Sequence, residues 1–477
     1  MEVAVEGQRR PGGDPAFAAV LTVRADTQEA AVSLLDFLEP GWGVSVLPWH
    51  VAGQQRLLVQ VDGEDALRRV RQATGRRRRV IGWVDRLWMV SAGGRVQVRP
   101  RLPVRSAEDL ALVYTPGVGR LAAAIAARPA AAVEVTGRPN RVAVVSDGTA
   151  VLGLGDVGPL AALPVMEGKA ALFAQLADID AVPICLDAGD PDKVVAAVRA
   201  LAPTFGGINL ADIAAPACFD IERRLQDVLD IPVFHDDQHG TAVVVLAGLR
   251  NALRVVGKQL ETARIVVMGA GAAGTAVARL LLRAGTSDVT VWTRQGVLGP
   301  HLDELPAHKV WLAEHTNPRR IRSGLAHALV GADAVVGVSR GGLLSSQMVA
   351  EMALRPVVFA LANPEPEIRP EMLAGLDPVI ATGRCDYPNH ISNALVFPGV
   401  FRGALNARAP RITTAMLLAA ADVLAGLVGK ELLGPRRLLP DVLDPQVVPT
   451  VAAAVAAVEA SRHHAAEHAG DGGWIDE

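Results

Sequence analysis

The segment "IPVFHDDQHGTAVVV" places two adjacent carboxylates, Asp236 and Asp237, between His235 and His239 and between two apolar runs. The H-x-x-x-H spacing suits a zinc peptidase only if one helix carries both imidazoles on one face. The flanks argue against this, because "IPVF" predicts a short buried strand and "GTAVVVLAGLRNAL" predicts the start of a helix. The carboxylates are therefore expected on a strand-to-helix turn, where open α/β sheets bind ligands.

A second chemical motif lies in "ARIVVMGAGAAGTAVARLLLRAG", where Gly269, Gly271 and Gly274 form a G-x-G-x-x-G fingerprint. The first glycine permits the tight turn, the second admits a pyrophosphate, and the third lets helix and strand pack closely. The alternative is a glycine-rich turn without a ligand. A buried strand before the motif and an amphipathic helix after it favour dinucleotide binding.

The cofactor's identity depends on the next strand, "SDVTVW". An acidic residue at its end would hold the ribose 2′-hydroxyl of NAD, but the strand ends in Thr293 and Arg294. Because a carboxylate is missing and a guanidinium is present, the cofactor is NAD or NADP.

Apolar strands alternating with helices surround both motifs ("VAVVSDG", "VPICLD", "GGINL", "IPVF"), which predicts a parallel sheet and the α/β class. We expect a catalytic domain at residues 99–245, a Rossmann dinucleotide-binding domain at 246–408, helices at 409–460 and a flexible tail at 461–477.

Residues 1–98 predict a separate, small α+β module. Strand, helix, strand, strand and helix are expected in "FAAVLTVRA", "TQEAAVSLLDFLE", "GVSVLPWHV", "QRLLVQVD" and "GEDALRRVRQA", and a strand pair around "MVSAGGRVQVRPRLPVRS". The β-α-β-β order resembles the ACT regulatory domains. The module has "ADTQEAA" where the first ACT ligand loop has Pro-Gly, so effector binding is not carried over.

Composition excludes several classes of protein. The net charge of −3 over 477 residues gives no reason to expect a nucleic acid partner, and the run Arg76 to Arg79 is expected to be a solvated face. Three distant cysteines fit a reducing compartment. No signal peptide is indicated and the apolar runs are interrupted, so we expect a cytoplasmic enzyme without a membrane partner.

Long strings between about Arg105 and Arg408 resemble the malic enzyme family: "VYTPGVG", "VSDGTAVLGLGDVGPLAALPVMEGKAALF", "FGGINLADIAAP", "VFHDDQHGTA", "MGAGAAG", "FALANPEPE" and "ATGRCDYPNHISNALVFPGVFRGAL". The N-terminal module is similar to that of bacterial forms with an ACT-like domain. The resemblance implies a malic-enzyme-like catalytic domain plus the Rossmann domain, acting on L-malate to give pyruvate and CO2 with reduction of NAD or NADP. It also implies a homodimer or larger homo-oligomer.

The resemblance assigns roles to five residues. Lys169 in "MEGK" matches the base for the malate 2-hydroxyl, and such a lysine needs a pKa lowered by burial and a nearby cation. Asp236 matches the residue that assists the base. Tyr114 in "YTPG" matches the acid that protonates the enolate. Asn363 and Asn393 match the amides that hold the substrate carboxylates. The alternative for Lys169 is a structural lysine, and without the resemblance each asparagine would more often be a turn residue.

Metal binding is the point at which the sequence departs from the family. Asp237 and Asp212 resemble ligands of Mn²⁺ or Mg²⁺, and His235 and His239 are then neighbours of the ion. The family pair Glu-Asp in "NLED" is "NLAD" here, so Ala211 replaces one ligand. Water can fill the vacancy at Mg²⁺, so we expect impaired rather than abolished activity. A smaller departure is Ser392, where bacterial relatives have Asn.

Three hypotheses follow. The first is a working malic enzyme with weakened metal affinity, supported by Lys169, Tyr114 and Asp236. The second is a catalytically reduced homologue with a regulatory role, suggested by Ala211, Thr293 and the altered ACT loop. The third is 2-hydroxy acid oxidation without decarboxylation.

Overall fold

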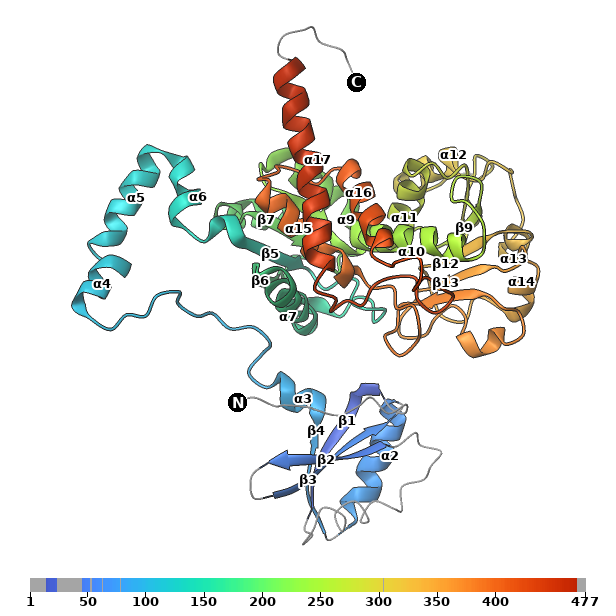
Figure 1. Ribbon diagram of the computed structural model, residues 1–477, viewed down its shortest axis with the longest axis horizontal. Coiled ribbons are helices and arrows are strands. Elements are labelled where there is room, and N and C mark those ends of the chain that lie inside the picture. The colour runs from blue at the N-terminus through green and yellow to red at the C-terminus, as the bar shows by residue number, and fades with distance from the viewer. Residues whose placement is uncertain are drawn as a thin grey trace. The chain divides into compact units, whose positions relative to one another are not determined.

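A computed structural model describes residues 14–23, 45–51, 54–61, 63–77, 79–302 and 304–469 of the chain (Figure 1). The chain divides into two compact units, Met1–Arg95 and Val96–Glu477. Each is described by itself.

The N-terminal unit is a four-stranded antiparallel sheet with two described helices. The strand order is β2 (Ser45–Val51), β3 (Gln54–Val61), β1 (Asp14–Val23), β4 (Val80–Asp85), and α2 (Glu64–Gly75) packs on it. The first three strands and α2 lie where the sequence predicts them, while the predicted helix "TQEAAVSLLDFLE" falls outside the described residues. β4 is an edge strand that the sequence did not reveal.

The strand pair predicted around residues 89–106 is wrong. A short helix, α3 (Arg86–Ser91), is followed by irregular chain, and Val98 there is fully exposed. Pro100 and Pro103 lack the N–H group that a ladder needs. A two-stranded hairpin without a third strand is marginal, so alternating apolar residues alone do not form one.

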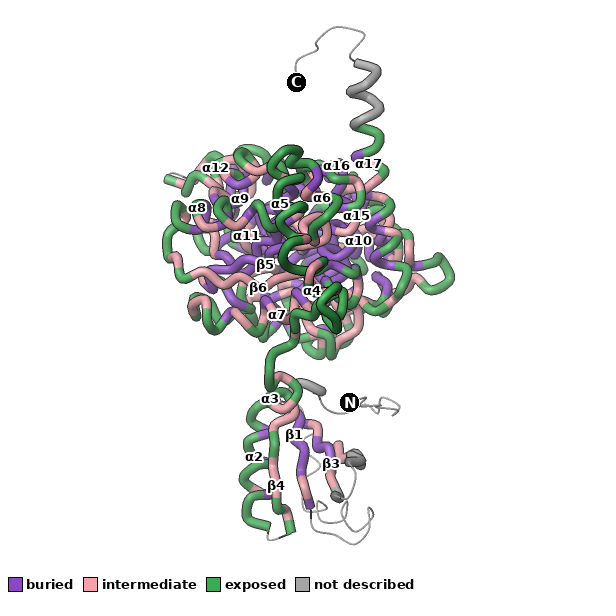
Figure 2. Tube along the Cα trace, turned by 90° about the vertical axis from the view of Figure 1, so that its left-hand side faces the viewer, coloured by how far each residue is buried: buried purple, intermediate pink, exposed green. Residues whose placement is uncertain are grey.

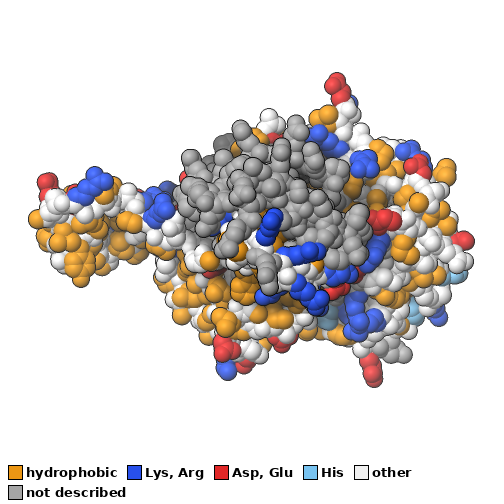
Figure 3. Space-filling model, turned by 90° about the horizontal axis from the view of Figure 1, so that it is seen from below, with side chains coloured by type: hydrophobic (Ala, Val, Ile, Leu, Met, Phe, Trp, Pro, Cys, Tyr) orange, Lys and Arg blue, Asp and Glu red, His pale blue; other side chains and the backbone are white. Residues whose placement is uncertain are grey.

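A helical arm, residues 107–135, begins the second unit. It consists of α4 (Ala107–Val113), α5 (Gly117–Ala127) and α6 (Ala132–Val135), and it projects away from the rest of this unit (Figure 1). Figure 2 shows α4 and α5 mainly in the colour of exposed residues. No residue of α4 or α5 is buried. Hydrophobic side chains gather on the arm (Figure 3) and include Leu110, Leu112 and Leu121.

The first half of the second unit contains the parallel sheet that the sequence predicts. The strand order is β6 (Asp180–Cys185), β5 (Arg141–Ser146), β7 (Gly207–Leu210), β8 (Val233–His235). The helices of this half are α7 (Gly158–Ala177), α8 (Pro191–Leu201), α9 (Ala217–Val228) and α10 (Thr241–Val255). Strand β8 and helix α10 are joined by one π-helical turn, Asp236–Gly240, called the π-turn below.

The second half is a Rossmann-like sheet, as predicted. Its strand order is β11 (Gly296–Val297), β10 (Asp288–Thr293), β9 (Arg264–Met268), β12 (Ala334–Gly337), β13 (Val357–Ala360), β14 (Val379–Thr382), with only β11 antiparallel. Its helices are α11 (Ala272–Arg283), α12 (Ala307–His315), α13 (Leu325–Leu329) and α14 (Ser346–Ala350).

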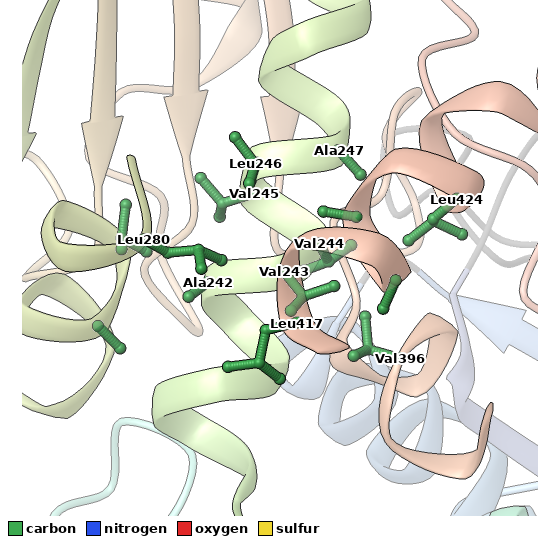
Figure 4. Packing of buried hydrophobic residues seen from close by; sticks show 14 of the residues in the cluster. Ala242, Val243, Val244, Val245, Leu246, Ala247, Leu280, Val396, Leu417 and Leu424 are labelled. Atoms are coloured by element: carbon green, nitrogen blue, oxygen red, sulfur yellow. The ribbon is translucent and has the colours of Figure 1, made fainter. Parts of the chain in front are cut away.

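One hydrophobic core joins the two halves, and α10 lies in its middle. Figure 4 shows Val243 and Val244 of α10 beside Leu417 and Leu424 of α16 (Thr414–Gly426). Helices α15 (Phe397–Asn406) and α17 (Val447–Ala469) complete this layer. Because α17 continues to Ala469, the first nine residues of the predicted flexible tail are helical.

Two stretches of the described chain have the length and apolarity of a membrane span, Ala107–Ala127 and Gly158–Ala177. The first is divided between α4 and α5, and the second is α7, which packs on β5 and β6. Core helices pass the same test, so two such stretches are weak grounds for a membrane protein.

Candidate active site

A lysine, a carboxylate and an amide meet at the carboxyl edge of the first parallel sheet. Lys169 comes from α7, Asp236 from the π-turn after β8, and Asn393 from a short 3₁₀ helix after β14. Lys169 Nζ lies 2.7 Å from Asp236 Oδ2, and Asn393 Nδ2 donates to the same oxygen at 2.8 Å. Asp236 is fully buried and the Lys169 side chain is 11% exposed. The lysine is therefore held with its amine at the floor of the site.

Two more carboxylates approach the same amine. Lys169 Nζ lies 3.6 Å from Asp237 Oδ1, and Asp237 Oδ2 accepts a 2.7 Å hydrogen bond from the backbone N–H of Asp212. Asp212 itself follows β7 with φ of +54°, a left-handed backbone that aspartate tolerates better than most residues. Asp236 and Asp237 lie on the strand-to-helix turn that the sequence predicts, and Asp212 lies after the end of β7.

These carboxylates suit a divalent cation. Asp212 Oδ2 and Asp236 Oδ1 are buried and accept no hydrogen bond from the described residues. Burial, opposed by Lys169 and reinforced by Asp237 and Asp236, raises the pKa of Asp212 to about 7. Burial, again opposed by Lys169, also raises the pKa of Asp236 to about 6. Crowded anionic oxygens without donors are hard ligands of the kind that Mg²⁺ and Mn²⁺ take.

Protein ligands are nonetheless few. Within the described residues, no group of three or more His, Cys, Asp and Glu side chains is arranged as a metal-ligand set. Ala211, at the family's glutamate position, is fully buried in the core, and its N–H donates to Val145 O at 2.9 Å. At the position of the missing carboxylate, the Ala211 methyl group is therefore packed in the apolar core.

The pKa of Lys169 runs against the sequence-based expectation. Burial lowers it, but Asp236, Asp237 and Asp212 together outweigh burial and raise it above the ordinary lysine value. The expectation of a lowered pKa included a bound cation, whereas the protein groups alone favour the ammonium form. The charge on Lys169 is therefore set by the balance between the carboxylates and whatever cation they hold.

Asn363 lies near this cluster but is not hydrogen-bonded to it. It follows β13, is exposed, and its Nδ2 is 3.4 Å from Gly383 O. The loop before α7 approaches so closely that a Cβ at Gly153 would collide with the Asn363 carbonyl oxygen. Ser392 is a helix cap, whose hydroxyl accepts from the Ala394 N–H at 3.3 Å.

Tyr114 is the one predicted catalytic residue that the structure does not bring to the cluster. It ends α4 on the arm and is 64% exposed. The arm projects from its own unit (Figure 1), so the phenol and the Lys169 amine are separated within one copy of the chain.

The two histidines flank the carboxylates without facing them as ligands. His239 Nε2 lies 2.8 Å from Glu222 Oε1, and Glu222 also accepts from Gln238 Nε2 at 3.0 Å and from the His235 N–H at 3.0 Å. Sequence reasoning missed Glu222, a buried residue of α9 that fixes the outer side of the π-turn. An acidic residue on the apolar face of a predicted helix was the available signal.

The glycine fingerprint has the geometry that a dinucleotide requires. Gly269 has φ of +116°, and a Cβ there would be 2.7 Å from Val338 O. A Cβ at Gly274 would collide with the Gly269 carbonyl, whereas Gly271 has open space. The three positions thus provide turn, close packing and a free approach for phosphate. Gly269 and Gly271 line a cavity of about 1020 Å³.

Cations line the far part of this cofactor cavity. Thr293 and Arg294 lie there as predicted, with Lys309 and Arg340, which the sequence did not suggest. The Thr293 hydroxyl accepts the Gln295 N–H at 3.1 Å, and Lys309 Nζ donates to Gln295 Oε1 at 3.0 Å. Among the described residues, three positive side chains and no carboxylate therefore line the cavity.

A buried glutamate joins the loop after β12, which lines the cofactor cavity, to the chain that follows β13. Glu367 is fully buried and accepts from the N–H groups of Ser339 at 2.9 Å and Ala362 at 3.0 Å. Burial raises its pKa despite these donors. It is the last residue of "FALANPEPE", so an acidic residue after an apolar strand was visible in the sequence.

Two family models match the chain: the malic enzyme N-terminal domain over residues 93–226 and the malic enzyme NAD binding domain over residues 238–460. The first contains Tyr114, Lys169 and Asp212, the second contains Asn363, Asn393 and the glycine fingerprint, and Asp236 and Asp237 lie in the short segment between the two matches. The resemblance based on sequence strings is thereby confirmed at the level of the family.

Three similar proteins are named as malic enzymes. The chain is 49% identical to the NAD-dependent malic enzyme of Geobacillus stearothermophilus, over 82% of this chain and 81% of that protein. It is 47% identical to the bifunctional malic/malolactic enzyme of Bacillus subtilis, over 76% and 89%. It is 45% identical to the NADP-dependent malic enzyme of Rhizobium meliloti, over 76% of this chain and 50% of that protein.

Solved structures agree with the sequences. The NAD-dependent malic enzyme from Thermotoga maritima is similar with a TM-score of 0.75 and 45% identity, covering 78% of this chain and 99% of that chain. The malic enzyme from Pyrococcus horikoshii has a TM-score of 0.74 and 46% identity, covering 78% and 88%. These relatives favour the catalytic hypothesis over the regulatory one. The chain belongs to the malic enzyme family.

Proposed function

We propose that the protein oxidatively decarboxylates L-malate to pyruvate and CO2 with NAD or NADP as hydride acceptor and Mn²⁺ or Mg²⁺ as the divalent ion. The observation that carries the proposal is the buried contact of Lys169 with Asp236, next to Asp237 and Asp212. A base, its partner and a dication site lie at one strand edge, which is the set of groups that the reaction needs.

Lys169 takes the proton of the malate 2-hydroxyl, and Asp236 holds the amine in place at 2.7 Å. When bound, the cation supplies electrophilic stabilisation at the C2 oxygen and the dinucleotide supplies the hydride acceptor. Asp212 and Asp237 hold the cation. The positive charge of a bound cation would offset the charges of Asp212 and Asp237, two of the three carboxylates that raise the pKa of Lys169.

Asn393 and Asn363 orient the substrate. Asn393 Nδ2, already fixed on Asp236 at 2.8 Å, presents its remaining N–H to a malate carboxylate. Asn363 follows the carboxyl end of β13, which is parallel to β14, and it is exposed, as a group that contacts ligand rather than core would be. Loss of CO2 leaves an enolate, whose C3 receives a proton from the Tyr114 hydroxyl.

The position of Tyr114 leads to a proposal about assembly. The arm of one copy packs on a second copy and delivers Tyr114 to the partner's Lys169, so that two chains complete each site. The support is threefold: Tyr114 is 64% exposed, α4 and α5 bury no residue, and Leu152 and Leu154 in the loop before α7 and Leu160 in its first turn are exposed. Exposed apolar side chains gathered in this way favour a protein interface. The smallest assembly that satisfies both arms is a symmetric homodimer.

The cofactor is proposed to include NADP. Arg294, Lys309 and Arg340 border the cavity where Thr293 stands in place of an acidic residue. Cations there would pair with a 2′-phosphate, and no carboxylate among the described lining residues would repel it. NAD binds the same glycine turn without that added contact.

We also propose the type of the N-terminal domain, the location of the protein in the cell and its domain bounds. The N-terminal unit is an ACT-like domain, since its described strands have the order β2-β3-β1-β4 with α2 packed against them. The protein acts in the cytoplasm. The domains are 1–98, 99–245, 246–408 and 409–460.

A direct assay tests the proposed reaction. Purified protein is given L-malate, either dinucleotide and a Mn²⁺ series, and pyruvate and reduced cofactor are measured together. Equal yields of pyruvate and reduced cofactor are expected. Reduced cofactor with oxaloacetate and no pyruvate would support oxidation without decarboxylation. No product at any metal level would contradict the proposal.

A further inference from the structure

A second cavity lies beyond the cofactor cavity, on the outer side of the π-turn. Two adjoining spaces of about 810 and 350 Å³ share the lining residues Gln238, His239, Thr275, Arg279, Thr414 and Leu417, and are called the Arg279 pocket. Its inner end is apolar, formed by Ala242, Leu280 and Leu417, which Figure 4 labels on three helices. The volumes are those of small-molecule sites.

The pocket holds positive charge that the protein does not neutralise. Arg279 lies with its guanidinium 4.9 Å from the centre of the Trp311 ring, and no carboxylate among the described residues forms an ion pair with it. Arg283 lines the same pocket and is likewise unpaired in the described part of the chain. Arg223 also lines the pocket, but it differs from Arg279 because it forms ion pairs with Asp220 and Asp227.

The carboxylates in the lining are already engaged. Glu222 accepts hydrogen bonds from His239, Gln238 and the His235 backbone, and Asp220 is bound by Arg223. Neither is available to Arg279. A stacked, unpaired guanidinium beside hydroxyl groups of Thr275 and Thr414 is a receptor for carboxylate or phosphate oxygens.

The walls of the pocket belong to the two elements on which catalysis depends. One wall is the π-turn, whose Asp236 and Asp237 face Lys169 while its Gln238 and His239 face the pocket. Another is α11, which begins at the glycine fingerprint and presents Thr275 and Arg279. A π-helical turn is an uncommon conformation that is often found at functional sites.

We propose that the Arg279 pocket binds a small anionic metabolite, carrying carboxylate or phosphate groups, and that its occupancy changes the affinity of the active site for malate or dinucleotide. The ligand contacts Arg279 on α11 and the side of the π-turn opposite the catalytic carboxylates. It can therefore shift both elements together. Coupling between two sites in proteins is typically about 5–150-fold in affinity.

Binding is tested by calorimetry on the whole protein in metal-free buffer, with inorganic phosphate and tricarballylate as separate probes. At least one probe is expected to bind once per chain, and the stronger probe identifies the source as phosphate or polycarboxylate. Arg279→Gln is expected to weaken that binding about tenfold or more, the effect of losing a charge-assisted hydrogen bond. Arg199→Gln, on an exposed part of α8, is the matched control.

A second variant guards against misfolding of the first. Thr414 is exposed, and Thr414→Asp places a carboxylate in the pocket, so it is expected to abolish binding while the thermal unfolding temperature is unchanged. The same probe is expected to change the KM for malate or dinucleotide of the wild type but not of Arg279→Gln. No binding of either probe, or equal binding by wild type and both pocket variants, would overturn the proposal. The binding outcomes do not depend on the catalytic reaction, whereas the change in KM does.

Discussion

The carboxylate cluster around Lys169 and the arm that carries Tyr114 serve the same proposed reaction but are built in opposite ways. Asp236 is fully buried and fixed by two donors, whereas Tyr114 is 64% exposed on helices that bury nothing. Parallel strands deliver their carboxyl ends to one edge, so a single chain assembles the cluster. The arm has no sheet to position it, and in the proposed homodimer a second copy gives it a surface. Folding of one chain therefore forms the carboxylate cluster, whereas the proposed association of two chains positions Tyr114.

The largest effect is expected at the centre of the cluster. Lys169→Ala removes the base and is expected to lower turnover of malate by about 10²–10⁴-fold, the usual range for such a loss. Dinucleotide binding, followed by fluorescence, is expected to be unchanged. Lys193→Ala, an exposed lysine on α8, is the control. Wild-type turnover of Lys169→Ala would show that another group is the base.

On the arm, Tyr114→Phe removes only the hydroxyl. Malate binding is expected to persist, while turnover and the exchange of pyruvate C3 protons with solvent fall by about 10²-fold, within the range for a general acid. Steady-state kinetics and proton NMR measure the two effects. Normal exchange in this variant would assign the acid to a different residue.

Metal affinity sharpens the comparison within the cluster. Ala211→Glu adds the missing carboxylate beside Asp212, and the Mn²⁺ concentration for half-maximal activity is expected to fall about tenfold, since even indirect metal contacts contribute 10–100-fold. The added side chain enters a fully buried position, so Ala211→Gln controls for packing. A metal titration at saturating malate distinguishes them. If wild type already saturates at micromolar Mn²⁺ and the variant gains nothing, water or another residue fills the position.

The smallest effects are expected in the cofactor cavity. The wild type is expected to use both dinucleotides. A kcat/KM for NAD more than roughly a hundredfold above that for NADP (about 2.7 kcal/mol) would contradict the proposal that the cofactor includes NADP. Lys309→Ala is expected to lower kcat/KM for NADP by about tenfold and leave NAD nearly unchanged, because one charge-assisted contact is lost. Thr293→Asp is expected to move the ratio toward NAD.

Lys430→Ala, on an exposed loop after α16, is the control for the loss of a positive charge. Equal loss with both dinucleotides in Lys309→Ala would assign this lysine to general binding rather than to the 2′-phosphate.

Sequence reasoning succeeded where local pattern and chemistry coincide. The alternation of strands and helices predicts both parallel sheets, and the turns after β8 and β9 predict where Asp236 and Gly271 lie. It failed where an element depends on distant partners. Val98 and its neighbours alternate as a strand does, but no described strand pairs with them. Lys309 reaches the cofactor cavity from α12 and Arg340 from the loop after β12, and no local pattern marks them.

The pKa of Lys169 gave a different lesson. The sequence identified the lysine, but the direction of its shift depends on three carboxylates that only the fold brings together. Desolvation and charge act in opposite directions on this amine, and their balance is a property of the assembled site.

The shared site is tested most directly by mixing two inactive proteins. Lys169→Ala and Tyr114→Phe are co-expressed with different tags, and the mixed dimers are assayed for pyruvate formation. If each arm serves the partner subunit, one of the two sites in a mixed dimer contains both Lys169 and Tyr114. Because about half of the dimers in a random mixture are mixed, the mixture recovers roughly a quarter of wild-type turnover. If Tyr114 serves its own chain, every site stays defective. Activity no higher than the mean of the two separate variants would contradict the account.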